Sequence, residues 1–211
     1  PVCGLGIGVA LVVIDALASL LWTKPVVSMI DVVALAGITG ALHLDGLADT
    51  ADGLYGRREP EKVLSIMKDS RVGAMGLVAV VCCLALKWVA IAHIFAHYKI
   101  WLFIVPAYAR AAVLFGTRFL PYGRPGGGTG QPFFNPPLQA TDFWSLGLLV
   151  PLSMLVSWHW FTLNLGFSVI VLTTLWWFRR KINCITGDML GALIEITETG
   201  LFILAAIHWG T

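Results

Sequence analysis

The chain has 211 residues, of which 58% are hydrophobic and only 12% are charged, and its mean hydropathy is +0.83. A soluble domain of this length has too little interior to bury so much apolar surface, so the composition indicates a membrane protein with several spans. The net charge of +2 is too small to indicate a nucleic-acid partner. The four cysteines lack the spacing of a metal site, so we expect neither zinc nor a disulfide.

Apolar runs that are long enough to cross a bilayer occur about seven times. They predict an all-α fold, a polytopic transmembrane helix bundle that forms one integral-membrane domain over residues 1–211. Because the chain starts at Pro1 and not at Met, we expect that an N-terminal piece precedes it. A short turn at residues 162–164 is expected between the fifth span and the sixth. The expected spans are 2–22, 26–42, 74–96, 100–120, 143–161, 165–178 and 188–209.

The connections between these spans alternate between the two sides of the membrane, and their charges differ. Ten Lys and Arg residues lie in or beside the connections 43–73, 119–142 and 179–187, whereas only Lys24 and Lys99 lie in those on the other side. The positive-inside rule therefore places the first set in the cytoplasm. These connections also hold most of the chemically active side chains, so we expect the active site on the cytoplasmic face.

The segment 39–76 holds six of the twelve acidic residues of the chain. Asp45, Asp49 and Asp52 are spaced i, i+4 and i+7, so a helix would place all three carboxylates on one face. A hard divalent cation bound by carboxylate oxygens would remove the repulsion between them. We therefore expect a Mg²⁺ site, or a Mn²⁺ site. The alternative is an acidic loop between two spans that binds no metal.

Charged residues also stand at the start of the third expected span. Glu59 and Pro60 predict the start of a short helix, and Lys68, Asp69 and Arg71 follow it. Charged side chains beside small residues favour a contact with phosphate. Ordinary flanking residues that extend toward the membrane surface would give the same pattern.

The connection at 121–130 is rich in glycine and contains one arginine. The backbone N–H groups of Gly126 and Gly128, together with the guanidinium of Arg124, suit an anion. A flexible linker explains the same composition equally well. Arg110 falls inside a span, where an unpaired charge is costly, so it should face the interior and meet a carboxylate or a phosphate.

Three acidic residues follow in the last expected span. Glu195 lies seven residues after Asp188 on the same helical face, and Glu198 adjoins Glu195. Such acids could complete the metal site or bind a polar part of a substrate. The alternative is that they pair with Arg110.

The run from Thr39 to Gly53, TGALHLDGLADTADG, closely resembles the hallmark of the cobalamin-5′-phosphate synthase family, also called adenosylcobinamide-GDP ribazoletransferase. The likeness continues through residues 66–73, the Pro-Tyr-x-Arg-Pro sequence at 121–125 and the Thr-Gly-Asp-x-x-Gly-Ala sequence at 186–192. The resemblance implies a multi-pass enzyme of the prokaryotic cytoplasmic (inner) membrane. Its substrates would be adenosylcobinamide-GDP and α-ribazole or α-ribazole 5′-phosphate, and GMP would leave.

Transfer between such substrates requires neutralised charge on a diphosphate and a base for the attacking hydroxyl. The expected metal ligands are Asp45, Asp49, Asp52 and Asp188. The candidate bases are His43, Asp69 and Glu195. The candidate phosphate or substrate ligands are Arg57, Lys68, Arg71, Arg110, Arg124, Gly126, Gly128 and Glu198.

Two other functions remain open from the sequence, and so does an oligomeric state. A CDP-alcohol phosphotransferase shares the opening Asp49-Thr-Ala-Asp52-Gly53, but the second aspartate pair of that family is absent after Gly73. An ion-coupled transporter could use intramembrane residues such as Asp15 and Asp31. Transporters usually contain internal repeats, and we find none that is convincing.

Overall fold

The computed structural model describes residues 1–94, 99–124, 127–128, 130–135, 137 and 139–207. Within these ranges the regular structure is helical, which confirms the predicted all-α class. Short 3₁₀ turns cover Gln131–Phe133, Ala140–Phe143 and Met154–His159. The α-helices are α1 (Val2–Ala18), α2 (Lys24–Ile38), α3 (Leu42–Leu54), α4 (Pro60–Ile66), α5 (Ala74–His93), α6 (Ile100–Phe119), α7 (Trp144–Ser153), α8 (Trp160–Ile182) and α9 (Gly187–Ala205).

Three of these helices, α5, α6 and α8, are long and apolar enough to cross a membrane. Helices α2 and α3 pass the same test together, but they are bent by 87° at the short break between them. The described residues therefore contain three candidate spans, or four if the bent pair counts as one. This supports an integral membrane protein, whereas the full set of seven spans stays a prediction.

The turn that we expected at residues 162–164 is wrong, because α8 runs through it without a break. Asn164, a polar residue that suggested a turn, is hydrogen-bonded inside the bundle. Its side-chain amide donates to the hydroxyl of Ser153 at 2.9 Å, and its carbonyl oxygen accepts from the hydroxyl of Tyr108 at 2.9 Å. The chain instead reverses earlier, in the 3₁₀ segment Met154–His159.

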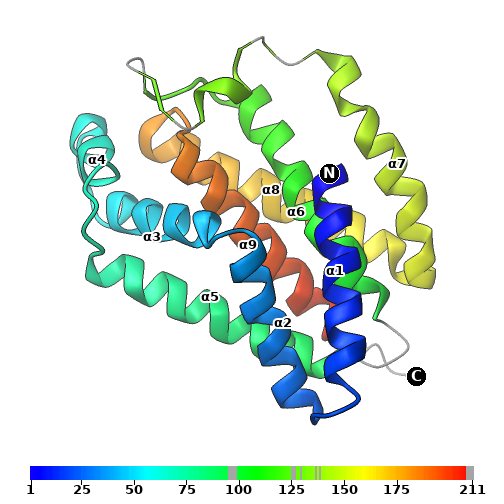
Figure 1. Cartoon of the computed structure of the whole chain (residues 1–211). Coiled ribbons are helices and arrows are strands. Elements are labelled where there is room, and N and C mark those ends of the chain that lie inside the picture. Colours follow the sequence, from blue (N-terminus) through cyan, green and yellow to red (C-terminus); the bar gives the residue numbers. More distant parts are fainter. Residues whose placement is uncertain (95–98, 125–126, 129, 136, 138, 208–211) are drawn as a thin grey trace.

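Helix α9 lies in the middle of the bundle and packs against α3, α5, α6 and α8 (Figure 1). Helix α1 packs against α6 at close range. A Cβ atom built on Gly8 would lie 2.0 Å from the carbonyl oxygen of Phe103, so only glycine allows this approach.

The structure brings the three basic connections together at one end of the bundle. Tyr122 and Ile185 form a β-bridge between the 121–130 connection and the α8–α9 connection. Lys181, at the end of α8, donates to the carbonyl oxygen of Gly56 at 3.1 Å. The only two basic residues that we placed on the other side, Lys24 and Lys99, both pair with Asp15.

Candidate active site

A sharp turn between α2 and α3 directs the acidic helix across the bundle. Gly40 and Ala41 both have left-handed backbone conformations, with φ of 58° and 56°. Helix α3 begins at Leu42 and carries Asp45 in its first turn, Asp49 one turn later and Asp52 near its end. The predicted helix through the three aspartates is thus confirmed.

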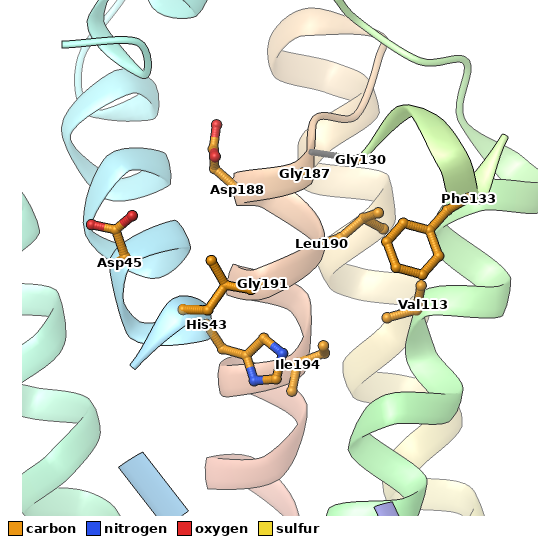
Figure 2. A pocket seen from close by; sticks show the side chains of 11 residues that line it. His43, Asp45, Val113, Gly130, Phe133, Gly187, Asp188, Leu190, Gly191 and Ile194 are labelled. Atoms are coloured by element: carbon orange, nitrogen blue, oxygen red, sulfur yellow. The ribbon is translucent and has the colours of Figure 1, made fainter. Parts of the chain in front are cut away.

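Helices α3 and α9 cross at a glycine contact that places Asp45 beside Asp188. A Cβ atom built on Gly46 would lie 2.6 Å from the carbonyl oxygen of Asp188, so a larger residue would push the helices apart. Gly191, one turn into α9, lies close to the backbone of His43. A Cβ atom built on Gly191 would lie 3.3 Å from the Cα atom of His43. Figure 2 shows Asp45 on α3 and Asp188 at the start of α9.

The carboxylates of α3 and α9 form an acidic cluster, which we define as Asp45, Asp49 and Asp188. Asp45, Asp188 and also Asp52 are close enough to Asp49 to repel its negative charge. Across the described ranges, however, no three His, Cys, Asp or Glu side chains converge as a ready-made metal site. The acidic cluster therefore supplies oxygen donors of the right kind without showing how they would coordinate an ion.

Asp52 differs from the other two aspartates of α3 because the backbone of α5 satisfies it. Its two carboxylate oxygens accept hydrogen bonds from the N–H groups of Gly73 at 2.7 Å and Gly76 at 2.8 Å. These groups belong to the start of α5, where unpaired N–H donors and the helix dipole favour a negative charge. Asp52 therefore caps α5 and fixes the end of α3 to it.

Arg124 links the glycine-rich connection to the acidic cluster. Its guanidinium donates to the carboxylate of Asp188 at 2.6 Å and to the carbonyl oxygen of Met67 at 3.2 Å. The Nε atom of Arg124 is buried, and no hydrogen-bond partner for it lies among the described residues. Thr186 caps the start of α9 by accepting a hydrogen bond from the N–H of Met189 at 3.3 Å, which holds Asp188 in the first helical turn.

A cavity of about 120 Å³ lies at this crossing (Figure 2). His43 lines it from α3, and its Nδ1 atom is buried without a hydrogen-bond partner among the described residues. Most of the remaining lining is apolar. The lining residues are Leu42, His43, Asp45, Val113, Gly130, Phe133, Gly187, Asp188, Leu190, Gly191 and Ile194.

Glu195 and Glu198 lie deeper in the bundle and are paired with basic residues. Lys87, from the middle of α5, contacts both carboxylates at 2.6 Å. Arg110 pairs with Glu198, which confirms that this intramembrane arginine meets a carboxylate. We name these four residues, Lys87, Arg110, Glu195 and Glu198, the buried charge network. A basic residue inside a span requires an acidic partner, so the position of Lys87 in an apolar run is itself a signal for such a pair.

Asp69 and Arg71 form an ion pair at the surface, with 2.5 Å between a carboxylate oxygen and a guanidinium nitrogen. Hydrogen bonds from Arg71 lower the pKa of Asp69 to about 2. Lys68 is exposed beside them, and together with the end of α3 they stand at the entrance to α5. These charged residues therefore lie apart from the cavity beside His43.

The remaining expected ligands lie in two places. Arg57 is exposed and lines a separate groove against the end of α8. Gly128 packs near the side chain of Arg124, since a Cβ atom built on it would lie 3.5 Å from the Cδ atom of Arg124. Gly126 lies outside the described residues.

Carboxylates that suit a divalent cation thus stand beside an arginine that suits a phosphate, at one end of a bundle of candidate membrane helices. These are the groups that a membrane enzyme acting on a phosphate ester requires. The chain belongs to the cobalamin-5-phosphate synthase family, whose model matches residues 1–206. It is 36% identical over 205 residues to the adenosylcobinamide-GDP ribazoletransferase of Geotalea daltonii, covering 94% of this chain and 80% of that protein.

Two further relatives carry the same name. The protein of Syntrophobacter fumaroxidans is 40% identical over 176 residues, which cover 81% of this chain and 70% of that protein. The protein of Acetivibrio thermocellus is 31% identical over 210 residues, which cover 97% of this chain and 83% of that protein. No solved structure matches the chain.

Proposed function

We propose that the chain transfers adenosylcobinamide phosphate from adenosylcobinamide-GDP to α-ribazole or α-ribazole 5′-phosphate and releases GMP, a late step of cobalamin biosynthesis. Family membership and the shared name of the relatives support this activity. The structural observation that carries it is the α3–α9 crossing, where His43, Asp45 and Asp188 line one cavity and Arg124 donates to Asp188. We assign the reaction to this place.

Asp45, Asp49 and Asp188 are the residues that would hold Mg²⁺, or Mn²⁺ in its place. Their carboxylate oxygens are the donors that these hard cations prefer. Asp49 experiences the negative charges of its neighbours, and a cation would offset this repulsion. When bound, the ion supplies positive charge against the diphosphate oxygens of the substrate. We leave Asp52 out of this set because both of its oxygens already accept backbone hydrogen bonds.

Arg124 is the residue that we assign to the diphosphate. Its Nη2 atom is held by Asp188 and Met67, while its buried Nε atom keeps a donor without a partner among the described residues. A buried donor without a partner is costly, so a phosphate oxygen that accepts from it would bind favourably. The ion pair with Asp188 thus orients Arg124 before the substrate arrives.

His43 is the base that the geometry favours. Its imidazole lines the cavity together with Asp45, and its Nδ1 atom has no hydrogen-bond partner among the described residues. We assign to it the proton of the ribose hydroxyl of α-ribazole. As the hydroxyl oxygen bonds to the phosphorus that carries adenosylcobinamide, the bond from this phosphorus to the bridging oxygen breaks. GMP leaves with that oxygen.

The two other candidate bases are less suited to this role. Asp69 is held in an ion pair with Arg71 at the surface and does not line the cavity beside His43. Glu195 is buried in an ion pair with Lys87, and this ion pair would be lost if Glu195 accepted a proton from the substrate.

The apolar side chains of the cavity, such as Phe133 and Leu190, suit the flat base of α-ribazole.

We further propose that the protein lies in the prokaryotic inner membrane with the site facing the cytoplasm. The support is the charge asymmetry, together with the contacts that join the three basic connections at one end. Water-soluble substrates and the leaving GMP would then stay on the cytoplasmic side.

The test is incubation of the purified chain in lipid nanodiscs with adenosylcobinamide-GDP, α-ribazole and Mg²⁺. We expect GMP and a cobalamin product to appear in equal amounts, to disappear with EDTA and to return with added Mg²⁺. Release of CMP from CDP-diacylglycerol and an alcohol, without GMP release in the first assay, would instead support a CDP-alcohol phosphotransferase.

A further inference from the structure

A second polar groove lies outside the reaction cavity, at the end of α8. Its volume is about 560 Å³. One wall is the connection between α3 and α4 at residues 56–59, which contributes Arg57 and Arg58. The other wall is the last two turns of α8, which contribute Trp176, Trp177, Arg180 and Lys181. Four basic side chains therefore face one acidic residue, Glu59.

Three of the four basic side chains are held in place by groups that do not neutralise them. Lys181 donates to the carbonyl oxygen of Gly56 at 3.1 Å, and Arg58 donates to the carbonyl oxygen of Asp52 at 2.9 Å. The guanidinium of Arg180 stacks on the ring of Trp176 at 5.2 Å. Over the described ranges none of the four forms an ion pair. The groove therefore presents ordered positive charge that exceeds the charge of its one acidic residue, Glu59.

The groove opens onto an apolar stripe along α8. Leu165, Val169, Leu172 and Trp176 are spaced by four, three and four residues, so they share one helical face. Their exposed fractions are 51%, 50%, 58% and 59%. Eleven residues of helix rise by about 16 Å, which is about half of a hydrocarbon core of about 30 Å. The stripe thus has about the length of the hydrocarbon part of one lipid leaflet. It ends at Trp176, on whose ring Arg180 stacks.

We propose that this groove binds the phosphate headgroup of an anionic phospholipid, whose acyl chain lies along the α8 stripe. Trp176 and Trp177 stand at the junction of apolar stripe and basic groove, as tryptophans do at a membrane interface. The basic side chains supply the attraction to an anionic headgroup. A nucleotide phosphate would use the charges but not the stripe, which is why the geometry favours a lipid.

The experiment measures phosphatidylglycerol that stays bound to the purified full chain in native mass spectrometry, after titration from mixed micelles. The test variant is Arg180→Gln with Lys181→Gln. The matched control is Arg118→Gln with Arg179→Gln, which removes the same charge from exposed residues at the same end that do not line the groove. Because Arg180 and Lys181 line the groove, each should contribute about fivefold to binding of the headgroup, so we expect about 25-fold weaker retention in the test variant alone.

Folding and ligand identity are checked in the same series. Circular dichroism compares the folded state of all variants. The single variant Arg180→Gln keeps the contact of Lys181 with Gly56 and should weaken lipid retention about fivefold. Excess GDP and excess inorganic phosphate should leave the lipid bound. Equal loss in test and control variants would overturn the proposal, because only net charge would then matter. Displacement of the lipid by GDP would overturn it in favour of a nucleotide site.

Discussion

Asp49 and Asp52 lie three residues apart on one helix, but their surroundings give them different roles. Asp52 accepts two hydrogen bonds from the start of α5, whereas Asp49 faces the negative charges of Asp45 and Asp188. The sequence spacing placed all three aspartates of α3 on one face and could not separate them. The separation depends on Gly73 and Gly76, which reach Asp52 only through the tertiary packing of α3 on α5.

Asp52→Asn should therefore destabilise the protein, while Asp49→Asn should not. The amide cannot accept both backbone hydrogen bonds at the start of α5, and losing a hydrogen bond to a charged group costs about 2 kcal/mol. Asp49→Asn removes repulsion within the acidic cluster and should keep or raise stability. Thermal unfolding of both variants in detergent tests this contrast. Equal stability of the two variants would contradict the capping role of Asp52.

The ion pair of Asp69 with Arg71 gives a pH dependence with a defined sign. The pKa of Asp69 is lowered to about 2 by Arg71, against about 3.9 for an unfolded chain. A lowered carboxyl pKa contributes stability above the unfolded value, and this contribution is lost as the pH falls from about 4 to about 2. Because Asp69 stays ionised between pH 6 and pH 8, its protonation cannot shape the activity profile in this range. The activity of Asp69→Asn between pH 6 and pH 8 should therefore show the same pH dependence as that of the unchanged chain. Loss of the acidic limb of the profile in this variant would identify Asp69 as the base.

At the scale of elements, the buried charge network connects α5 and α6 to α9. Lys87 and Arg110 balance Glu195 and Glu198 inside the bundle. The sequence predicted that Arg110 meets a carboxylate or a phosphate, and it left open whether that residue pairs with an acid of the last span. The sequence could not specify which basic residue pairs with which acidic residue, because this depends on the orientation of α5 and α6 about their helix axes.

Lys87→Met should be strongly destabilising, and adding Glu195→Gln should recover most of the loss. The single change leaves a buried carboxylate without its partner, which costs about 3 kcal/mol or more. The double change keeps the Arg110–Glu198 pair and removes the one carboxylate, Glu195, that the loss of Lys87 leaves unpaired. Unfolding of the two variants and of Glu195→Gln alone in detergent completes a double-mutant cycle. Additive effects of the two changes would contradict the network.

Helix α8 shows where sequence reasoning about elements reached its limit. Thr162 and Asn164, two polar residues in an apolar run, predicted a turn, whereas the hydrogen bonds of Asn164 to Ser153 and Tyr108 lie within a continuous helix. A polar residue in an apolar run can end a helix or bond to a neighbouring helix, and its own sequence neighbours do not distinguish the two. Helix α3, by contrast, was predictable because its three aspartates repeat at helical spacing beside a glycine.

On the scale of the whole molecule, the account predicts one orientation in the membrane. Single cysteines placed at positions 57, 124 and 181 of a cysteine-free chain should resist an impermeant reagent added to intact cells, since all three belong to the end with the basic connections. A cysteine at position 99 should react. Permeabilised cells provide the control in which all four positions are accessible. Labelling of position 124 but not of position 99 from outside would reverse the orientation.

The central claim is that the acidic cluster at the α3–α9 crossing carries out the transfer. The most direct test is the rate of GMP release by Asp49→Asn in nanodiscs, with Glu61→Gln, an exposed acid in the first turn of α4, as the matched control. Removing a group that stabilises transition-state charge typically costs about a hundredfold or more in turnover. The account predicts such a loss for Asp49→Asn in a folded protein and near-normal turnover for Glu61→Gln. Near-normal GMP release by folded Asp49→Asn would contradict it.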